Sequence, residues 1–390
     1  MFGATLLGVA LFHHRTLTVA LVGLLAILVY KFTITGFSDG VGLPGFSAHI
    51  NHHWVELTNL GLLLLGFALL SRHFEQSNLP ELAPDILPDN WKGGLVLLAL
   101  VFVMSAFLDN IAGALIGATI AAHIYRRKVH IGFLAAIVAA SNAGGAGSVV
   151  GDTTTTMMWI AGKSPLDVLP AYVGSLVAFA VFAIPASRAQ QRFCPILKHD
   201  VGGIMVDWAR VWIVVFMLAC AIGANVAANL VAPNLAHAIP VIGLALWFAV
   251  LSASLARRPD WSVLPEAAKG AAFLLSLVFA ASLMPVEALP PASVASTLGL
   301  GFVSAVFDNI PLTALALAQG GYDWGFLAYA VGFGGSIVWF GSSAGVAVSN
   351  LFPEAKSAIA WLRAAWWLPI AYAAGYGVMV ILLGWRPHEQ

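Results

Sequence analysis

The sequence predicts an all-α polytopic membrane protein built from two inverted repeats, each with a re-entrant helical hairpin and a discontinuous transmembrane helix. Three observations predict this fold. The 390 residues are 60% hydrophobic and only 9% charged, whereas soluble domains carry roughly 25% charged residues. Apolar stretches long enough for membrane spans follow one another along the chain. Two glycine-rich motifs recur in corresponding places of the two halves.

The charge balance limits the partners. Lys plus Arg and Asp plus Glu number 18 each, so nothing indicates nucleic acid as a partner. We expect membrane lipid and small cations as partners and no cofactor, and a homodimer is left open. The stretch 1–12 has no basic region and no small-residue cleavage site, so we expect no cleavable signal peptide. That stretch is also short for a full span.

Seven stretches are candidate single spans, since about 20 apolar residues cross a bilayer as a helix. They are 16–35, 54–71, 166–186, 211–231, 237–256, 270–286 and 364–384.

Two further stretches are interrupted by an Asp-Asn pair. The first, 93–125, contains SAFLDN with Asp109-Asn110, and the second, 292–320, contains SAVFDN with Asp308-Asn309. Each arm of 93–125 has about 15 residues, or about 22 Å of helix. A hydrocarbon core is about 30 Å thick, so each stretch predicts a re-entrant hairpin with the Asp-Asn pair at its tip.

Two more stretches predict helices unwound at their centres. SNAGGAGSVVGDTTTT interrupts 131–162, and GFGGSIVWFGSS interrupts 324–352. Non-helical backbone at membrane depth requires burial in protein or a wet cavity. The glycine spacing is the same in both, which indicates an internal repeat. The matching glycines are Gly144, Gly145 and Gly151 in the first motif and Gly334, Gly335 and Gly341 in the second.

The basic residues predict an orientation. If both hairpins return to their starting side and both broken helices cross, fifteen of the 18 Lys and Arg residues fall on one side. That bias makes this side cytoplasmic and predicts a multi-pass protein of a bacterial-type cytoplasmic (inner) membrane. Each half then has five crossings, so the second half is inverted, as in many secondary transporters. The predicted parts are repeat 1–186, cytoplasmic linker 187–210 and repeat 211–390.

The polar residues of the tips and unwound helices predict a cation site. Na⁺ and Li⁺ prefer hard oxygen ligands, and freed carbonyls at helix C-termini add negative partial charge. A carboxylate in a low dielectric also holds a proton more readily, so one group can take a cation or a proton, as an antiporter requires. A Na⁺ ion at Asp109, Asn142 and Asp308 is the specific hypothesis. The candidate ligands are Asp109, Asn110, Asn142, Asp152, Thr153, Thr154, Asp308, Asn309, Ser342 and Ser343.

Structural roles compete with these. Each Asp could cap a helix, and Thr153–Thr156 could bond back to their own helix. His49, His52, His53 and Glu56 have the spacing of a metal site or pH sensor, but a wet loop entering a helix is the preferred interpretation. Among functions, a Na⁺- or H⁺-coupled carrier of a small organic or inorganic anion is the alternative. An intramembrane aspartyl protease is a remote one, because Val149-Val150-Gly151-Asp152 departs from its signature.

SAFLDNI, SAVFDNIPLTALA, SNAGGAGSVVGDTTTTMMWI and GFGGSIVWFGSSAGVAVSN resemble the NhaD-type Na⁺/H⁺ antiporters of the ion transporter superfamily, which includes citrate, dicarboxylate and arsenite carriers. The resemblance runs from His49 to the end of the second broken helix. It implies a secondary transporter rather than an enzyme, with ion and substrate sites at the tips and unwound helices. One departure is that Ile111 to Ala114 stand where the family tends to have threonines, which removes hydroxyl ligands.

Overall fold

The structure is a computed structural model that describes residues 1–12, 15–37, 40–79, 87–196, 205–231, 238–284, 290–307 and 309–387. Every named element within these ranges is a helix, which confirms the all-α prediction. In chain order the elements are α1 (Phe2–Leu11), α2 (Thr16–Tyr30), η2 (Lys31–Thr35), α3 (Gly42–Glu75), α5 (Trp91–Ser105), α6 (Asn110–Ile124), α7 (Ile131–Gly145), α8 (Thr153–Ile160), α9 (Pro165–Val168), α10 (Ala171–Phe193), α11 (Trp208–Val231), α13 (Val241–Ala253), η4 (Trp261–Val263), α14 (Leu264–Ser282), α15 (Val294–Ser304), α16 (Asn309–Gln319), α17 (Trp324–Gly334), α18 (Ser343–Leu351), η6 (Pro353–Lys356), α19 (Ala358–Ala364) and α20 (Trp367–Leu383).

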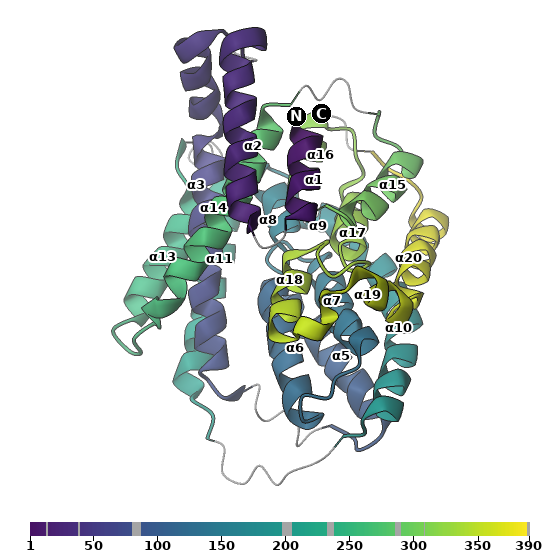
Figure 1. The fold of residues 1–390 in the computed structure, drawn as a ribbon. Coiled ribbons are helices and arrows are strands. Elements are labelled where there is room, and N and C mark those ends of the chain that lie inside the picture. The colour runs from purple at the N-terminus through teal and green to yellow at the C-terminus, as the bar shows by residue number, and fades with distance from the viewer. Residues whose placement is uncertain are drawn as a thin grey trace.

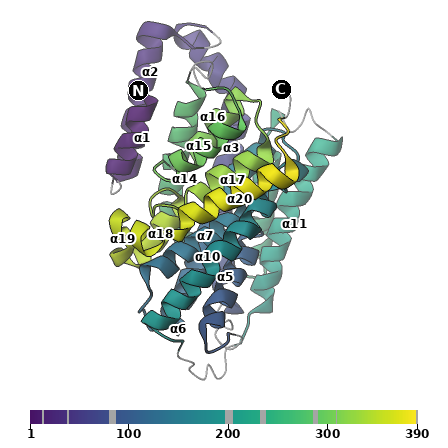
Figure 2. The same ribbon diagram turned by 90° about the vertical axis from the view of Figure 1, so that its right-hand side faces the viewer.

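The helices form two groups that lie side by side (Figure 1). In the flanking group, α3 packs against α11, α13 and α14, and α2 packs against α1 and α14. The motif group contains α5–α8, α10 and α15–α20, and within it α10 lies along α20 (Figure 2). The groups meet where α14 contacts α16 and where α3 contacts α6 and α8. The helix breaks at the Asp-Asn pairs and both glycine-rich motifs therefore lie in one group, next to a flanking group that carries neither.

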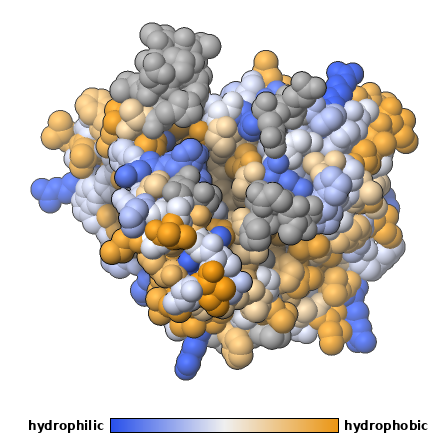
Figure 3. All heavy atoms as spheres, turned by 90° about the horizontal axis from the view of Figure 1, so that it is seen from above, coloured by the Kyte–Doolittle hydropathy of each residue, from blue (hydrophilic) through white to orange (hydrophobic). Residues whose placement is uncertain are grey.

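Several helices are long and apolar enough to cross a membrane. Among the described residues, length and composition select Thr16–Thr35, Gly42–Glu75, Pro165–Phe193 and Trp261–Ser282, and the pair α19 and α20, bent by 63°, adds a fifth. Seen from above, hydrophobic side chains gather along the rim of the molecule (Figure 3). These features agree with a polytopic membrane protein.

The helix α3 corrects one interpretation of the sequence. It runs from Gly42 to Glu75, well beyond the predicted span 54–71, so residues 49–56 are helical and the wet-loop interpretation is wrong. The physical reason is packing: His49 is buried, and its Nε2 lies 3.0 Å from Ser282 Oγ on α14. The His49 ring also lies 5.7 Å from the Phe279 ring, so α14 supports the extra turns.

The helices around both Asp-Asn pairs are short. Helices α5 and α6 have 15 residues each, and α15 and α16 have 11 each. At 1.5 Å per residue none exceeds about 23 Å, which is less than the thickness of a hydrocarbon core. The first break lies between Ser105 and Asn110 and the second between Ser304 and Asn309, as the sequence predicts. Asp308 itself is outside the described residues.

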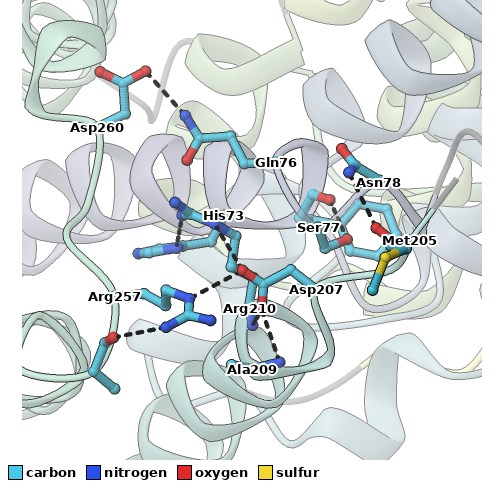
Figure 4. A network of polar contacts seen from close by, with 12 residues as sticks. His73, Gln76, Ser77, Asn78, Met205, Asp207, Ala209, Arg210, Arg257 and Asp260 are labelled. Carbon is cyan, nitrogen blue, oxygen red and sulfur yellow. Dashed lines mark hydrogen bonds and ion pairs between the residues drawn. The ribbon is translucent and has the colours of Figure 1, made fainter.

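A polar network joins three parts of the flanking group at one end (Figure 4). Asp260, just before η4, accepts hydrogen bonds from Arg72 Nε at 2.8 Å and Gln76 Nε2 at 3.3 Å, both at the end of α3. Asp207, just before α11, accepts one from Arg257 Nε at 3.0 Å. Much of the predicted linker 187–210 lies in α10 or outside the described residues. The network fixes the ends of three helices to each other.

This network makes the fold sensitive to acid. Hydrogen bonds from Ser262 and then Arg72 lower the pKa of Asp260 to about 2, and the bond from Arg257 lowers the pKa of Asp207. Both carboxylates therefore stabilise the fold above the ordinary Asp pKa of about 3.9, and this contribution is lost as the pH falls toward about 2. We expect the melting temperature of the purified protein to fall between about pH 5 and about pH 3, and to fall less in Asp260→Asn. An equal fall in both proteins would contradict the prediction.

Candidate functional site

The motifs bring helix ends to the centre of the motif group. Helices α5, α7, α15 and α17 end at the motifs, and α6, α8, α16 and α18 begin there. Side chains cap three of the new beginnings: Asp109 Oδ2 accepts from Ile111 N, Asp152 Oδ1 from Thr154 N, and Ser342 Oγ from Gly345 N. Asp109 and Asp152 thus do cap helices. In Asp109 the cap uses Oδ2, while Oδ1 lies near the Thr153 hydroxyl.

Glycines allow the backbones of the motifs to touch. A side-chain carbon at Gly144 would overlap the Phe102 carbonyl of α5, and one at Gly334 would overlap the Gly301 carbonyl of α15. Within each motif, Gly145 faces the Gly151 carbonyl and Gly335 faces the Gly341 carbonyl. The same close contacts therefore occur in both halves. Close packing explains all six glycines, as it does at many helix contacts in membranes.

This packing gives a direct test. Gly144→Ala should lower the melting temperature and the yield of folded protein, because the added methyl group overlaps a backbone carbonyl that cannot move aside; overpacking of this kind costs about 1–3 kcal/mol or more. Gly223→Ala in α11 is the matched control, since nothing lies within 4 Å of its added carbon. Fluorescence-detected gel filtration after heating compares the two variants, and equal stability would refute the packing role.

Asn142, in the last turns of α7, links the two halves. Its Oδ1 accepts from Asn110 Nδ2 at 3.1 Å, and its Nδ2 donates to Ser336 Oγ at 3.0 Å and Ser342 Oγ at 3.1 Å. All four side chains are buried. The structure therefore brings together the side chains of Asn110, Asn142 and Ser342, which lie far apart in the sequence.

Asp109 and Thr153 form a second contact between motifs. The Thr153 hydroxyl on α8 lies 3.5 Å from Asp109 Oδ1 at the start of α6. The other threonines differ: Thr155 and Thr156 donate to backbone carbonyls of residues 148–152, so they bond back to their own motif. Thr154 Oγ1 is buried with no hydrogen-bond partner among the described residues. Thr153 is thus the threonine of this run that faces the first tip.

Two cavities lie between the flanking and motif groups. The first, of about 490 Å³, is lined by His49, His52, His53 and Glu56 of α3 together with parts of α8, α14 and α16. The second, of about 660 Å³, is lined by parts of α2, α14 and α18 that include Lys269, Ser343 and Asn350. Within the described part of the chain, no three His, Cys, Asp or Glu side chains cluster as a metal site. Polar and ionisable side chains therefore reach both cavities.

An apolar cluster joins the two groups beside the first cavity. Leu60, Met157, Leu274 and Ile310 come from α3, α8, α14 and α16 and pack together. Leu60 and Met157 also line the first cavity, and Phe273, which packs against the cluster, lines the second. We call these four residues the apolar seal.

Some site residues were missed by the sequence reasoning. Ser336 accepts from Asn142, and Ser141 lies 3.0 Å from Ser105 and donates to the Asn110 carbonyl. A signal was present, since Ser105 and Ser304 are the first residues of both hairpin motifs. Among the predicted ligands, no described contact joins Asp109 to Asn142. Asp308, the third member of the hypothetical Na⁺ site, lies outside the described residues.

Comparison with known proteins identifies the family. Residues 6–334 match the family described as citrate transporter, which covers most of the chain. This chain is a member of the citrate transporter family. The family consists of transporters, so the prediction of a secondary transporter and not an enzyme is confirmed.

Several individual relatives of the chain are named as antiporters. The chain is 27% identical over 358 residues to sodium/proton antiporter 1 of Arabidopsis thaliana, which covers 77% of the chain and 58% of that relative. It is 25% identical over 338 residues to the Na⁺/H⁺ antiporter NhaD of Vibrio parahaemolyticus, covering 73% of the chain and 78% of the relative. NhaD of Vibrio cholerae is 27% identical over 338 residues. These relatives confirm the resemblance to NhaD-type antiporters, although the chain spans little more than half of the plant protein.

Proposed function

We propose that this chain exchanges Na⁺ or Li⁺ for H⁺ across a membrane by alternating access. The observation that carries the proposal is the position of two carboxylates, Asp109 and Asp152, at helix beginnings in the middle of the motif group. Asp152 is 1% exposed. Ionisable groups at membrane depth usually mark an ion or proton path, and the antiporters among the relatives have the same type of activity in their names.

The charges at the helix ends support a cation over an anion. Helix beginnings carry positive partial charge and would attract an anion. Here acidic caps at α6 and α8 offset that charge. The ends of α5, α7, α15 and α17 carry negative partial charge at the same centre, which suits a cation.

The repeats form part of the proposal. The corresponding glycine contacts of Gly144 and Gly334, and of Gly145 and Gly335, support two related halves. We propose that the halves are inverted, that 93–125 and 292–320 are re-entrant hairpins, and that the basic loops face the cytoplasm of a bacterial-type inner membrane. In this orientation the cavity that contains His49 opens outward and the one that contains Lys269 opens inward. Alternating access exposes one central site to each side of the membrane in turn, and these two cavities are the proposed routes to it.

A coupled carrier of a small anion is the second candidate. The family description favours it, and so do the neutral hydrogen-bonding groups Asn142, Ser336 and Ser342 at the centre. A protonated Asp would weaken the repulsion of a carboxylate substrate.

Everted membrane vesicles distinguish the two candidates. Respiration acidifies the vesicle interior, and addition of NaCl or LiCl should dissipate the pH gradient only in vesicles that contain this protein. Citrate or another carboxylate, added as its potassium salt, should have no such effect. If neither cation dissipates the gradient between about pH 7 and about pH 9, where a carboxylate antiporter should be deprotonated, the antiporter proposal is wrong.

A further inference from the structure

Helix α10 carries a connected line of exposed side chains. It lies on the outer face of the motif group, beside α20 (Figure 2). Every fourth residue is exposed, from Leu176 through Ala180 and Ile184 to Arg188 and Arg192. Residues four positions apart are neighbours on the surface of a helix. These five residues therefore form one line along α10, which we call the α10 stripe.

The α10 stripe changes from apolar to basic between Ile184 and Arg188. Leu176 is 57% exposed and Ile184 is 37% exposed, although both are hydrophobic. They belong to Pro165–Phe193, which is long and apolar enough to cross a membrane, so this half of the stripe faces acyl chains. Arginine side chains near the end of such a helix reach the level of the headgroups. The stripe therefore has the same order of chemistry as a phospholipid, from apolar chain to charged headgroup.

Positive charge accumulates at the basic end of the α10 stripe. Arg188 and Arg192 are exposed and lie four residues apart, a spacing at which like charges destabilise a helix. The Arg188 guanidinium lies 4.9 Å from the centre of the Trp91 ring, and the exposed Lys92 follows Trp91. Asp89 is the one acidic residue of this short segment, and within the described ranges no ion pair joins an acidic side chain to these three basic residues. An anion bound here would offset the repulsion.

The flanking group differs at the end that the sequence places on the same side. There Arg72 pairs with Asp260 at 2.8 Å, and Arg257 and Arg210 lie 3.0 Å and 3.6 Å from Asp207. The flanking group therefore supplies counter-charges for its own arginines (Figure 4). The end of α10 does not, so its counter-charge has to come from outside the protein.

We propose that an anionic phospholipid binds along the α10 stripe. An acyl chain lies on the apolar half of the stripe, and the phosphate group binds Arg188 and Arg192, with Lys92 adding positive charge. Arginine suits this role because its planar guanidinium can donate two parallel hydrogen bonds to phosphate oxygens. Trp91 marks the headgroup level, where tryptophan is enriched. This lipid site does not depend on which ion the protein transports.

A first measurement uses the wild-type protein, purified in detergent. Phosphatidylglycerol added to the micelles should raise the melting temperature, because a ligand that binds the folded state stabilises it. Phosphatidylcholine, which has the same chains but no net charge, should raise it much less, and so should inorganic phosphate. An equal rise with phosphatidylcholine would show that the headgroup charge is not recognised. An equal rise with inorganic phosphate would assign the arginines to a free anion. Either result would overturn the proposal.

A second measurement uses the double variant Arg188→Gln/Arg192→Gln. We expect the phosphatidylglycerol concentration that gives half of the thermal shift to rise roughly 30-fold, which corresponds to about 1 kcal/mol per arginine. The matched control is Lys356→Gln/Arg363→Gln, which removes two positive charges from η6 and α19, away from the stripe. A wild-type concentration in the first variant, or an equal rise in the control, would overturn the proposal. The vesicle assay for ion exchange is independent of this result, so either conclusion can fail without the other.

Discussion

Asn142→Ala should abolish Na⁺-dependent dissipation of the pH gradient and lower the melting temperature of the protein. The variant removes the acceptor for Asn110 and the donor for Ser336 and Ser342, all of them buried. Each buried polar group left without a partner costs about 1–3 kcal/mol. Because Asn142 belongs to one motif and the two serines belong to the other, its loss separates the two unwound segments that must meet at the site.

A buried asparagine outside the site provides the control. Asn59 on α3 is 3% exposed, and its Oδ1 accepts from Gly243 N on α13 at 2.9 Å, so it also joins two helices. Asn59→Ala should lower the melting temperature but leave the KM for Na⁺ unchanged in vesicles that contain equal amounts of folded protein. If Asn142→Ala exchanges ions like Asn59→Ala, Asn142 serves stability alone.

Removing the charge at the hairpin tips should have the other large effect. We expect Asp308→Asn to abolish exchange and Asp109→Asn to have a similar or milder effect, with folding intact in both. An asparagine at 109 keeps one oxygen that can accept from Ile111 N, and its NH₂ group can donate to the Thr153 hydroxyl oxygen, so the cap survives while the ionisable group is lost. The pH gradient in everted vesicles measures exchange, and gel filtration measures folding.

The control for these two variants removes a carboxylate that lies outside the site. Asp207→Asn alters the network at the end of the flanking group and should leave exchange at the wild-type level. Wild-type rates in both tip variants would move the proton-binding group elsewhere, and Asp152, buried at the start of α8, is the first candidate.

Much of this arrangement was predictable from the sequence because glycine and aspartate break apolar helices at defined points. The breaks after Ser105 and Ser304 and the ends of α7 and α17 at Gly145 and Gly334 follow from local sequence. The extent of α3 does not follow from local sequence, since its first turns depend on His49 packing against α14. The role of Ser336 was not predictable either, because it depends on a hydrogen bond from Asn142, which lies 194 positions earlier in the sequence. Local sequence therefore determines where a helix ends, and contacts with residues distant in the sequence determine which groups surround that helix end.

The apolar seal has an electrical consequence. Leu60, Met157, Leu274 and Ile310 pack together from four helices; Leu60 and Met157 line the first cavity, and Phe273, which packs against the cluster, lines the second. In the proposed orientation, water in both cavities would concentrate the membrane potential on the protein between them, which includes this cluster. Moving one elementary charge through 100 mV is worth about 2.3 kcal/mol. A charged group that shifts only a few ångströms past these four side chains would therefore experience most of the voltage across the membrane.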